Sequence, residues 1–180
     1  MAFENREDAG RQLATALEGY RRRQPVVLAL PRGGVPVAAE VSAALDAPLD
    51  LIIARKIGVP DQPELAMGAV AEGPEPAIVR NEDVIVLAGV SAAEFNAVCE
   101  RERREIERRR RLYLGDRASV DVAGRSAIVI DDGIATGATM RAALLAVRAR
   151  KPRTVVLAVP VAPPSALAAL RRDVDHVVCL

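Results

Sequence analysis

Short apolar runs rich in Val and Ile alternate along the chain with longer segments of helical periodicity. This alternation is typical of βαβ units, in which a helix connects two parallel strands. The pattern therefore predicts an α/β fold with an open, mainly parallel sheet flanked by helices. The expected strands cover residues 26–30, 49–55, 126–132, 154–160 and 174–180, and the expected helices cover residues 35–45, 139–150 and 164–171.

The predicted strand at residues 126–132 lacks the alternation of apolar and polar residues that a half-exposed strand shows. Its run from Ala127 to Ile130 is apolar throughout. Such a run is typical of a strand covered on both faces, so we expect this strand at the centre of the sheet. Earlier in the chain, residues 67–72 indicate a weaker third strand, and residues 78–89 indicate a short antiparallel excursion.

A highly charged segment, residues 91–113, has the spacing of one long helix. Phe95, Val98, Ile106 and Tyr113 form a narrow apolar stripe, and the remainder is dominated by Glu and Arg. The basic half of this helix is a candidate for contact with a phosphate or an acidic partner. We favour a solvated, self-paired helix face, because Glu and Arg three and four residues apart pair along a helix.

The length and charge of the chain limit its function. The 180 residues suit one domain, expected over residues 1–180. Because 25 Lys and Arg balance 24 Asp and Glu, the net charge of +1 gives little attraction to nucleic acid or an anionic membrane. Two Tyr and two Phe are too few to build a stacking platform for single-stranded nucleic acid. We expect neither nucleic acid nor a membrane as partner.

The cellular compartment is also indicated. Cys99 and Cys179 are far apart, as is usual in a reducing compartment, and their spacing could not hold zinc. The start, MAFENREDAGRQL, contains acids and no apolar stretch, unlike a signal or transit peptide. The longest apolar tract, Val155 to Leu170, contains three prolines and is too short for a membrane span. These features predict a cytoplasmic protein.

The segment AIVIDDGIATGATM, residues 127–140, carries the clearest chemical pattern. Two adjacent acids, Asp131 and Asp132, end a strand, and a loop with glycines and threonines leads into a helix. Ligands of open α/β sheets bind at this edge, where the N–H groups of a helix N-terminus favour an anion such as phosphate. The acids are suited to accept hydrogen bonds from a sugar diol or to hold Mg²⁺, directly or through water.

The alternative is a purely structural loop. Gly133 and Gly137 would then supply only conformational freedom, and Thr136 or Thr139 would cap the helix. Two adjacent acids have no obvious structural partner at a sheet edge, and their mutual repulsion favours the ligand interpretation. The loop is neither of two common nucleotide loops: Ala138 stands where G-x-x-x-x-G-K-[ST] requires lysine, and no G-x-G-x-x-G follows the first strand.

This strand, the two acids and the turn ending in T-G-x-T resemble the signature of the type I phosphoribosyltransferases. The resemblance implies a core with a small hood and a flexible loop, Mg²⁺ as cofactor, phosphoribosyl pyrophosphate as donor, and a place in nucleotide salvage. It also implies that Asp131 and Asp132 contact the ribose 2′- and 3′-hydroxyls and act in catalysis. The implied 5′-phosphate loop consists of Ala135, Thr136, Gly137, Ala138 and Thr139, and Gly133 is a further implied contact to the donor.

Two further segments extend the resemblance over most of the chain. LALPRGG, residues 28–34, looks like the family's pyrophosphate loop, which implies contacts from Arg32 and Gly33 and an unusual peptide geometry that glycine tolerates. Residues 51–73 resemble the stretch that opens into a mobile catalytic loop. Arg55 and Lys56 would then neutralise the departing pyrophosphate, with residues 58–73 as a lid. The alternative for Arg55 and Lys56 is two surface cations.

The chain departs from the family pattern in ways that leave the base open. Ala135 stands where enzymes for 6-oxopurines usually have aspartate, and looks more like the adenine or orotate branches. No aromatic residue lies between Val155 and Leu180 to stack on a base, and we expect part of the hood to be absent or built differently. Glu64 and Glu72 are candidates to protonate a leaving base nitrogen, against the alternative of surface carboxylates without a role.

Taken together, these features predict a transferase that moves phosphoribosyl to a purine or pyrimidine base. Such a reaction needs fixed anion donors, magnesium and exclusion of water rather than a protein nucleophile. The single histidine, His176, gives no basis for a Ser-His-Asp site. Alternatives are a non-catalytic sensor of phosphoribosyl pyrophosphate and another phosphosugar enzyme. The expected partners are the donor and a base, and the family commonly forms homodimers.

Overall fold

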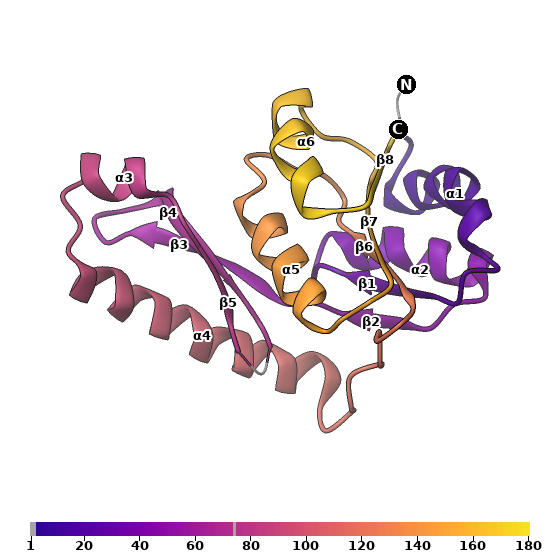
Figure 1. Ribbon diagram of the computed structural model, residues 1–180, viewed down its shortest axis with the longest axis horizontal. Helices are drawn as coiled ribbons and strands as arrows, with labels where there is room; N and C mark the ends of the chain where they lie inside the picture. Colours follow the sequence, from indigo (N-terminus) through magenta and orange to yellow (C-terminus); the bar gives the residue numbers. More distant parts are fainter. Residues whose placement is uncertain (1–2, 74) are drawn as a thin grey trace. The chain divides into compact units, whose positions relative to one another are not determined.

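The computed structural model of the protein describes residues 3–73 and 75–180 (Figure 1). Contacts divide the chain into two compact units. The first unit comprises Met1–Ile52, Ala118–Gly137 and Val147–Leu180, and the second comprises Ile53–Arg117 and Ala138–Ala146. The two units are described separately, and a single domain over the whole chain stays a prediction.

The first unit is built on a five-stranded sheet in the order β2-β1-β6-β7-β8, in which all pairs are parallel. Its strands are β1 (Pro25–Ala29), β2 (Leu49–Leu51), β6 (Ser126–Ile130), β7 (Thr154–Val159) and β8 (His176–Cys179). The parallel α/β prediction is confirmed. Strand β6 is central and buried at every position, as its unbroken apolar run predicts.

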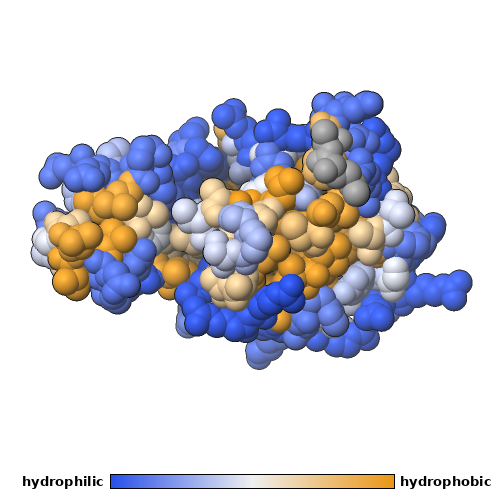
Figure 2. All heavy atoms as spheres, turned by 90° about the horizontal axis from the view of Figure 1, so that it is seen from above, coloured by the Kyte–Doolittle hydropathy of each residue, from blue (hydrophilic) through white to orange (hydrophobic). Residues whose placement is uncertain are grey.

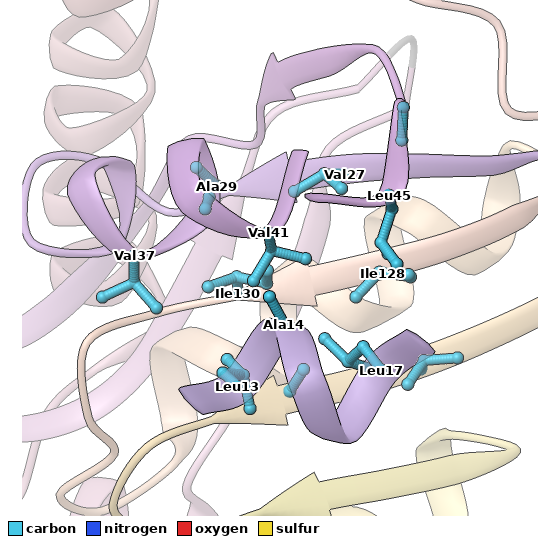
Figure 3. Packing of buried hydrophobic residues seen from close by; sticks show 14 residues of the cluster. Leu13, Ala14, Leu17, Val27, Ala29, Val37, Val41, Leu45, Ile128 and Ile130 are labelled. Atoms are coloured by element: carbon cyan, nitrogen blue, oxygen red, sulfur yellow. The ribbon is translucent and has the colours of Figure 1, made fainter. Parts of the chain in front are cut away.

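The core of this unit lies between the sheet and two helices, α1 (Arg6–Leu17) and α2 (Gly34–Leu45) (Figure 3). Alternate residues of the strands point into it, so one face of the sheet is covered by these helices. Helix α1 was not anticipated from the sequence. The fully buried residues at this interface include Leu13, Leu17, Val37, Val41, Leu45, Ile128 and Ile130.

The remaining predicted helices are present within a residue of their expected ends. They are α5 (Ala138–Ala149) and α6 (Pro164–Leu170), and short 3-10 helices follow α1 and α6 at Glu18–Tyr20 and Arg171–Asp173. Among the described residues, no helix combines the length and the apolar character needed to cross a bilayer.

The second unit holds a three-stranded antiparallel sheet, β3 (Ala54–Val59), β4 (Gln62–Ala71) and β5 (Ala77–Arg80), with helices α3 (Glu82–Leu87) and α4 (Ala92–Leu114). The predicted strand 49–55 was wrong in extent: β2 ends at Leu51, and Ala54 begins a strand of the other sheet. No helix separates β3 from β4, and a two-residue turn can join only antiparallel strands. The weaker strand predicted at residues 67–72 is the end of β4, and the antiparallel excursion consists of β5 followed by α3.

Helix α4 confirms the long helix expected at residues 91–113. Ser91 and Glu94 form a reciprocal capping box at its start. Its narrow apolar stripe packs against the antiparallel sheet through Phe95, Val98 and Ile106. The exposed side is self-paired as predicted; its ion pairs are Arg103 with Glu100, Arg108 with Glu105 and Arg109 with Glu105.

The side chain of Glu72 connects α4 to the hairpin that β3 and β4 form. One carboxylate oxygen accepts a hydrogen bond from Ile53 N at 2.8 Å, and the other accepts one from Arg110 of α4 at 2.7 Å. The side chain of Glu72 is only 13% exposed. Both oxygens are therefore engaged in holding the fold, which argues against the suggested role of Glu72 as a proton donor to the base.

We expect Glu72→Ala to lower the free energy of unfolding by about 2–3 kcal/mol, because it leaves a backbone N–H and a guanidinium without their shared acceptor. Urea unfolding measures the change. The matched control is Glu64→Ala, which removes a carboxylate whose side chain is 96% exposed. The control should change the free energy of unfolding by less than about 0.5 kcal/mol. Equal losses in both variants would contradict the structural role of Glu72.

Candidate functional site

The site lies at the carboxyl end of β6, where Asp131 and Asp132 follow the last strand residue. Both are half-buried, and the backbone N–H of Asp132 donates to Asp131 Oδ1 at 2.8 Å. The pKa of Asp131 is raised from 3.8 to about 7, chiefly because the carboxyl is partly buried. The backbone N–H of Asp132 and the charge of Arg6 lower this pKa, whereas the charge of Asp132 raises it. The structure confirms that the two acids lie at the carboxyl end of a strand, as the sequence predicts.

Arg6, from the first turn of α1, is the partner of Asp132. Its Nε and one terminal nitrogen each lie 2.7 Å from Asp132 Oδ2. Sequence reasoning missed this residue. A local signal existed for the helix, because Asn5 accepts the N–H of Asp8 at 2.7 Å as an N-cap. Nothing local indicates that Arg6 meets an acid 126 residues away.

The loop between β1 and α2 rests directly on the acid pair. A Cβ atom on Gly33 would lie 2.4 Å from Asp132 Oδ2, and one on Gly34 would lie 2.7 Å from Ile130 O. The loop is anchored by two backbone hydrogen bonds, from Leu30 N to Ile130 O at 2.9 Å and from Gly34 N to Leu30 O at 3.0 Å. Two glycines are required here because backbone and carboxylate occupy the space of a side chain.

One expectation for this loop is met in the structure, and the pyrophosphate contact of Arg32 stays a prediction. The peptide bond between Pro31 and Arg32 is cis, an unusual peptide geometry of the kind expected there. Arg32 is exposed, and no ion pair or side-chain hydrogen bond engages it within residues 3–73 and 75–180. Its guanidinium is therefore open to an anion.

The loop from Gly133 to Thr139 continues from the acids into α5. Gly137 occupies the N-cap position with φ +86°, and no side chain caps the helix. The hydroxyls of Thr136 and Thr139 make no hydrogen bond among the described residues, so the capping alternative is not realised. Ala135 and Thr136 are exposed, and Ala138 opens the helix. The first N–H groups of α5 are left for an anion.

Arg55 and Lys56 lie on β3 in the second unit, each beside a carboxylate. Arg55 Nε donates to Glu102 Oε2 at 2.9 Å, and Glu102 is buried on α4. Lys56 Nζ lies 3.0 Å from Glu64 Oε2. The proposed lid, residues 58–73, forms the end of β3, its turn and β4, rather than an irregular loop. The roles of Arg55, Lys56 and the lid stay predictions.

The acid pair fits magnesium by its chemistry. Mg²⁺ binds proteins through one or two carboxylates and completes its shell with water and substrate phosphates. Asp131 and Asp132 supply two carboxylates beside the loop open to phosphate. Among the described residues, no group of three or more His, Cys, Asp or Glu side chains is placed to hold a metal, so substrate and water would have to complete the shell at the acid pair.

The chain is similar in sequence to known proteins. The sequence matches the phosphoribosyl transferase domain over residues 2–180. It is 47% identical over 178 residues to Rv0571c of Mycobacterium tuberculosis, a protein named for the same transferase family. The match covers 99% of this chain and 40% of that protein, so the chain spans well under half of its relative.

Solved structures show the same fold. TT1426 of Thermus thermophilus is 41% identical with a TM-score of 0.81, covering 100% of this chain and 84% of that chain. A purine phosphoribosyltransferase of Pyrococcus horikoshii is 16% identical with a TM-score of 0.54, covering 99% of this chain and 84% of that one. The latter likeness shows the fold alone, and it agrees with the parallel sheet described above.

The raised pKa of Asp131 gives a pH-dependent stability in the metal-free protein. The folded state holds this proton more tightly than the unfolded state between pH 4 and about 7, so stability falls as pH rises through that window. Asp131→Asn removes the charge, and its advantage over the wild type should grow from near zero at pH 4 to about 1–2 kcal/mol at pH 8. Urea unfolding with a chelator present measures this; a pH-independent difference would contradict the assignment.

Proposed function

Because this chain belongs to the phosphoribosyl transferase domain family, we propose that it transfers the phosphoribosyl group of phosphoribosyl pyrophosphate to a nitrogenous base. The observation that supports the proposal is the close approach of Gly33 to Asp132. It brings the loop that we propose to bind the pyrophosphate beside the acid pair that we propose to bind the ribose diol. A sugar that carries pyrophosphate on C1, the carbon next to the diol, needs both features side by side. A simple sugar monophosphate needs only one of them.

In this reaction the bond from C1 of the ribose to the pyrophosphate oxygen breaks, a bond from C1 to a base nitrogen forms, and the proton of that nitrogen passes to the pyrophosphate or to solvent. Positive charge develops on the sugar ring and negative charge on the leaving group. The carboxylates of Asp131 and Asp132 accept hydrogen bonds from the ribose hydroxyls and lie close to the developing positive charge. Mg²⁺, when bound, neutralises the pyrophosphate oxygens.

The other residues bind the negatively charged groups of the donor. The N–H groups at the start of α5, with the hydroxyls of Thr136 and Thr139, bind the 5′-phosphate. The N–H groups of the Gly33 loop and the free guanidinium of Arg32 bind the pyrophosphate. Arg55 has to share or leave its ion pair with Glu102 to reach an anion, and Lys56 its pair with Glu64.

The partners follow from the same proposal: phosphoribosyl pyrophosphate, a base and Mg²⁺, with a cytoplasmic location. A homodimer is part of the proposal, and exposed apolar surface supports it. Val86 and Leu87 of α3 are 78% and 87% exposed, and an apolar (orange) patch marks the end of the second unit that carries α3 (Figure 2). Such patches commonly mark contacts between proteins.

The first test is titration calorimetry with phosphoribosyl pyrophosphate, with and without Mg²⁺, followed by a pyrophosphate-release assay with bases. We expect magnesium-dependent binding that is tighter than binding of ribose 5-phosphate. Asp131→Asn combined with Asp132→Asn should weaken donor binding at least about a hundredfold with little loss of fold, since two charge-assisted contacts are removed. Unchanged affinity in the double variant would overturn the site. Donor binding without turnover on any base would favour the sensor alternative.

Gly33→Ala tests the contact between the two loops. The added methyl must push the Asp132 carboxylate away from its position against the loop, since a Cβ atom would lie 2.4 Å from Asp132 Oδ2. We expect donor affinity to fall at least about tenfold. Gly19→Ala is the matched control, because a Cβ atom there meets nothing within 4 Å. Calorimetry on both variants measures the effect, and equal affinities would contradict the role of this approach.

A further inference from the structure

A pocket of about 440 Å³ lies in the first unit beside Asp132. One wall comes from the start of α2 and from the residue after β7, and the other from the beginning of the chain. The lining residues are Phe3, Asn5, Arg6, Glu7, Ala9, Pro36, Val37, Asp132 and Pro160. The pocket has the size of a small planar ligand and one wall in common with the acid pair.

This inference rests on the proposed function, whose chemistry restricts where the acceptor can bind. The attacking nitrogen must come within about 3–3.5 Å of C1 of the ribose. C1 is bonded to the carbon that carries the 2-hydroxyl, which Asp131 and Asp132 are proposed to hold. The acceptor therefore has to lie against the acid pair, and Asp132 lines this pocket.

The lining suits a planar ring. Phe3 supplies an aromatic face, and Pro36, Val37 and Pro160 supply apolar walls. The region after β7, residues 160–180, contains no Phe, Tyr or Trp. The stacking surface thus comes from the opposite end of the chain, where no sequence pattern indicated it.

The rim of the pocket carries both kinds of hydrogen-bonding group. The Oδ1 atom of Asn5 caps α1, so its amide N–H₂ group is left to donate. Glu7 offers a carboxylate that accepts, and no hydrogen bond or ion pair engages it in the described part of the chain. A ring with a carbonyl or bare nitrogen next to an N–H or amino group fits this rim.

We propose that this pocket is the acceptor site, that Phe3 stacks on the acceptor ring, and that the acceptor is a planar nitrogen heterocycle with adjacent donor and acceptor groups. Arg6 lines the same pocket and holds Asp132, and so connects the acceptor site to the sugar site. Asn5 and Glu7 read the edge of the ring.

The chain contains no tryptophan, which allows a direct test. Phe3→Trp places a single fluorophore in the pocket, and Tyr20→Trp places one elsewhere in the same unit as the matched control. Adenine, hypoxanthine, uracil and orotate are titrated with Mg²⁺ and ribose 5-phosphate present, so that the sugar position is filled without a leaving group. We expect saturable quenching by at least one base in Phe3→Trp and none in the control.

Affinity then separates stacking from mere proximity. For the base that quenches, Phe3→Ala should raise the dissociation constant about tenfold in calorimetry, and Phe3→Tyr should keep it within about threefold. A second pocket, about 430 Å³, is lined in part by Val161, Val177 and Cys179 and by neither acid. Weaker base binding in Val177→Ala with unchanged binding in Phe3→Ala would overturn the proposal.

Calorimetry with phosphoribosyl pyrophosphate, on the wild type and on Phe3→Trp, distinguishes failure of the acceptor site from failure of the proposed function. Donor binding without quenching by any of the four bases overturns the acceptor site and leaves the proposed function standing. Absence of donor binding in the wild type overturns the proposed function, and the acceptor site with it.

Discussion

The site depends on the close approach of two loops at one edge of the parallel sheet. Strands β1 and β6 are neighbours, so the loops that follow them must leave the sheet side by side. There is room for both only because Gly33 and Gly34 lack side chains where the carboxylate of Asp132 and the carbonyl of Ile130 lie. The acids and the backbone of the Gly33 loop are thus held together by the sheet and not by flexible side chains.

The two adjacent acids put negative charge in a half-buried position. Burial raises the pKa of Asp131, which means that its carboxylate is held at a cost in stability at neutral pH. Asp132 is compensated by Arg6 of α1, whose own helix packs on α2 through a tight apolar interface. A helix with a structural role in the core therefore also sets the electrostatics of the acid pair and lines the pocket beside it.

The second unit uses charge differently. Helix α4 is covered with Arg and Glu, and most of its pairs lie on its own surface, where they contribute little. Two contacts reach the hairpin instead, from Glu102 to Arg55 and from Arg110 to Glu72. Because the carboxylates of Glu102 and Glu72 are largely buried, these two contacts fix the position of the helix on the sheet. They also occupy Arg55 and Glu72, for which the sequence suggested catalytic roles.

The sequence by itself determined the parts recorded in local patterns. The apolar run of β6, the acids after it and the loop into α5 could be predicted because backbone periodicity and turn chemistry are local. The division of residues 49–55 between two sheets, the contact of Arg6 with Asp132 and the pocket lined by Phe3 were decided only by the tertiary structure. These join segments far apart in the chain, and packing of complete elements, rather than any neighbouring residue, brings them together.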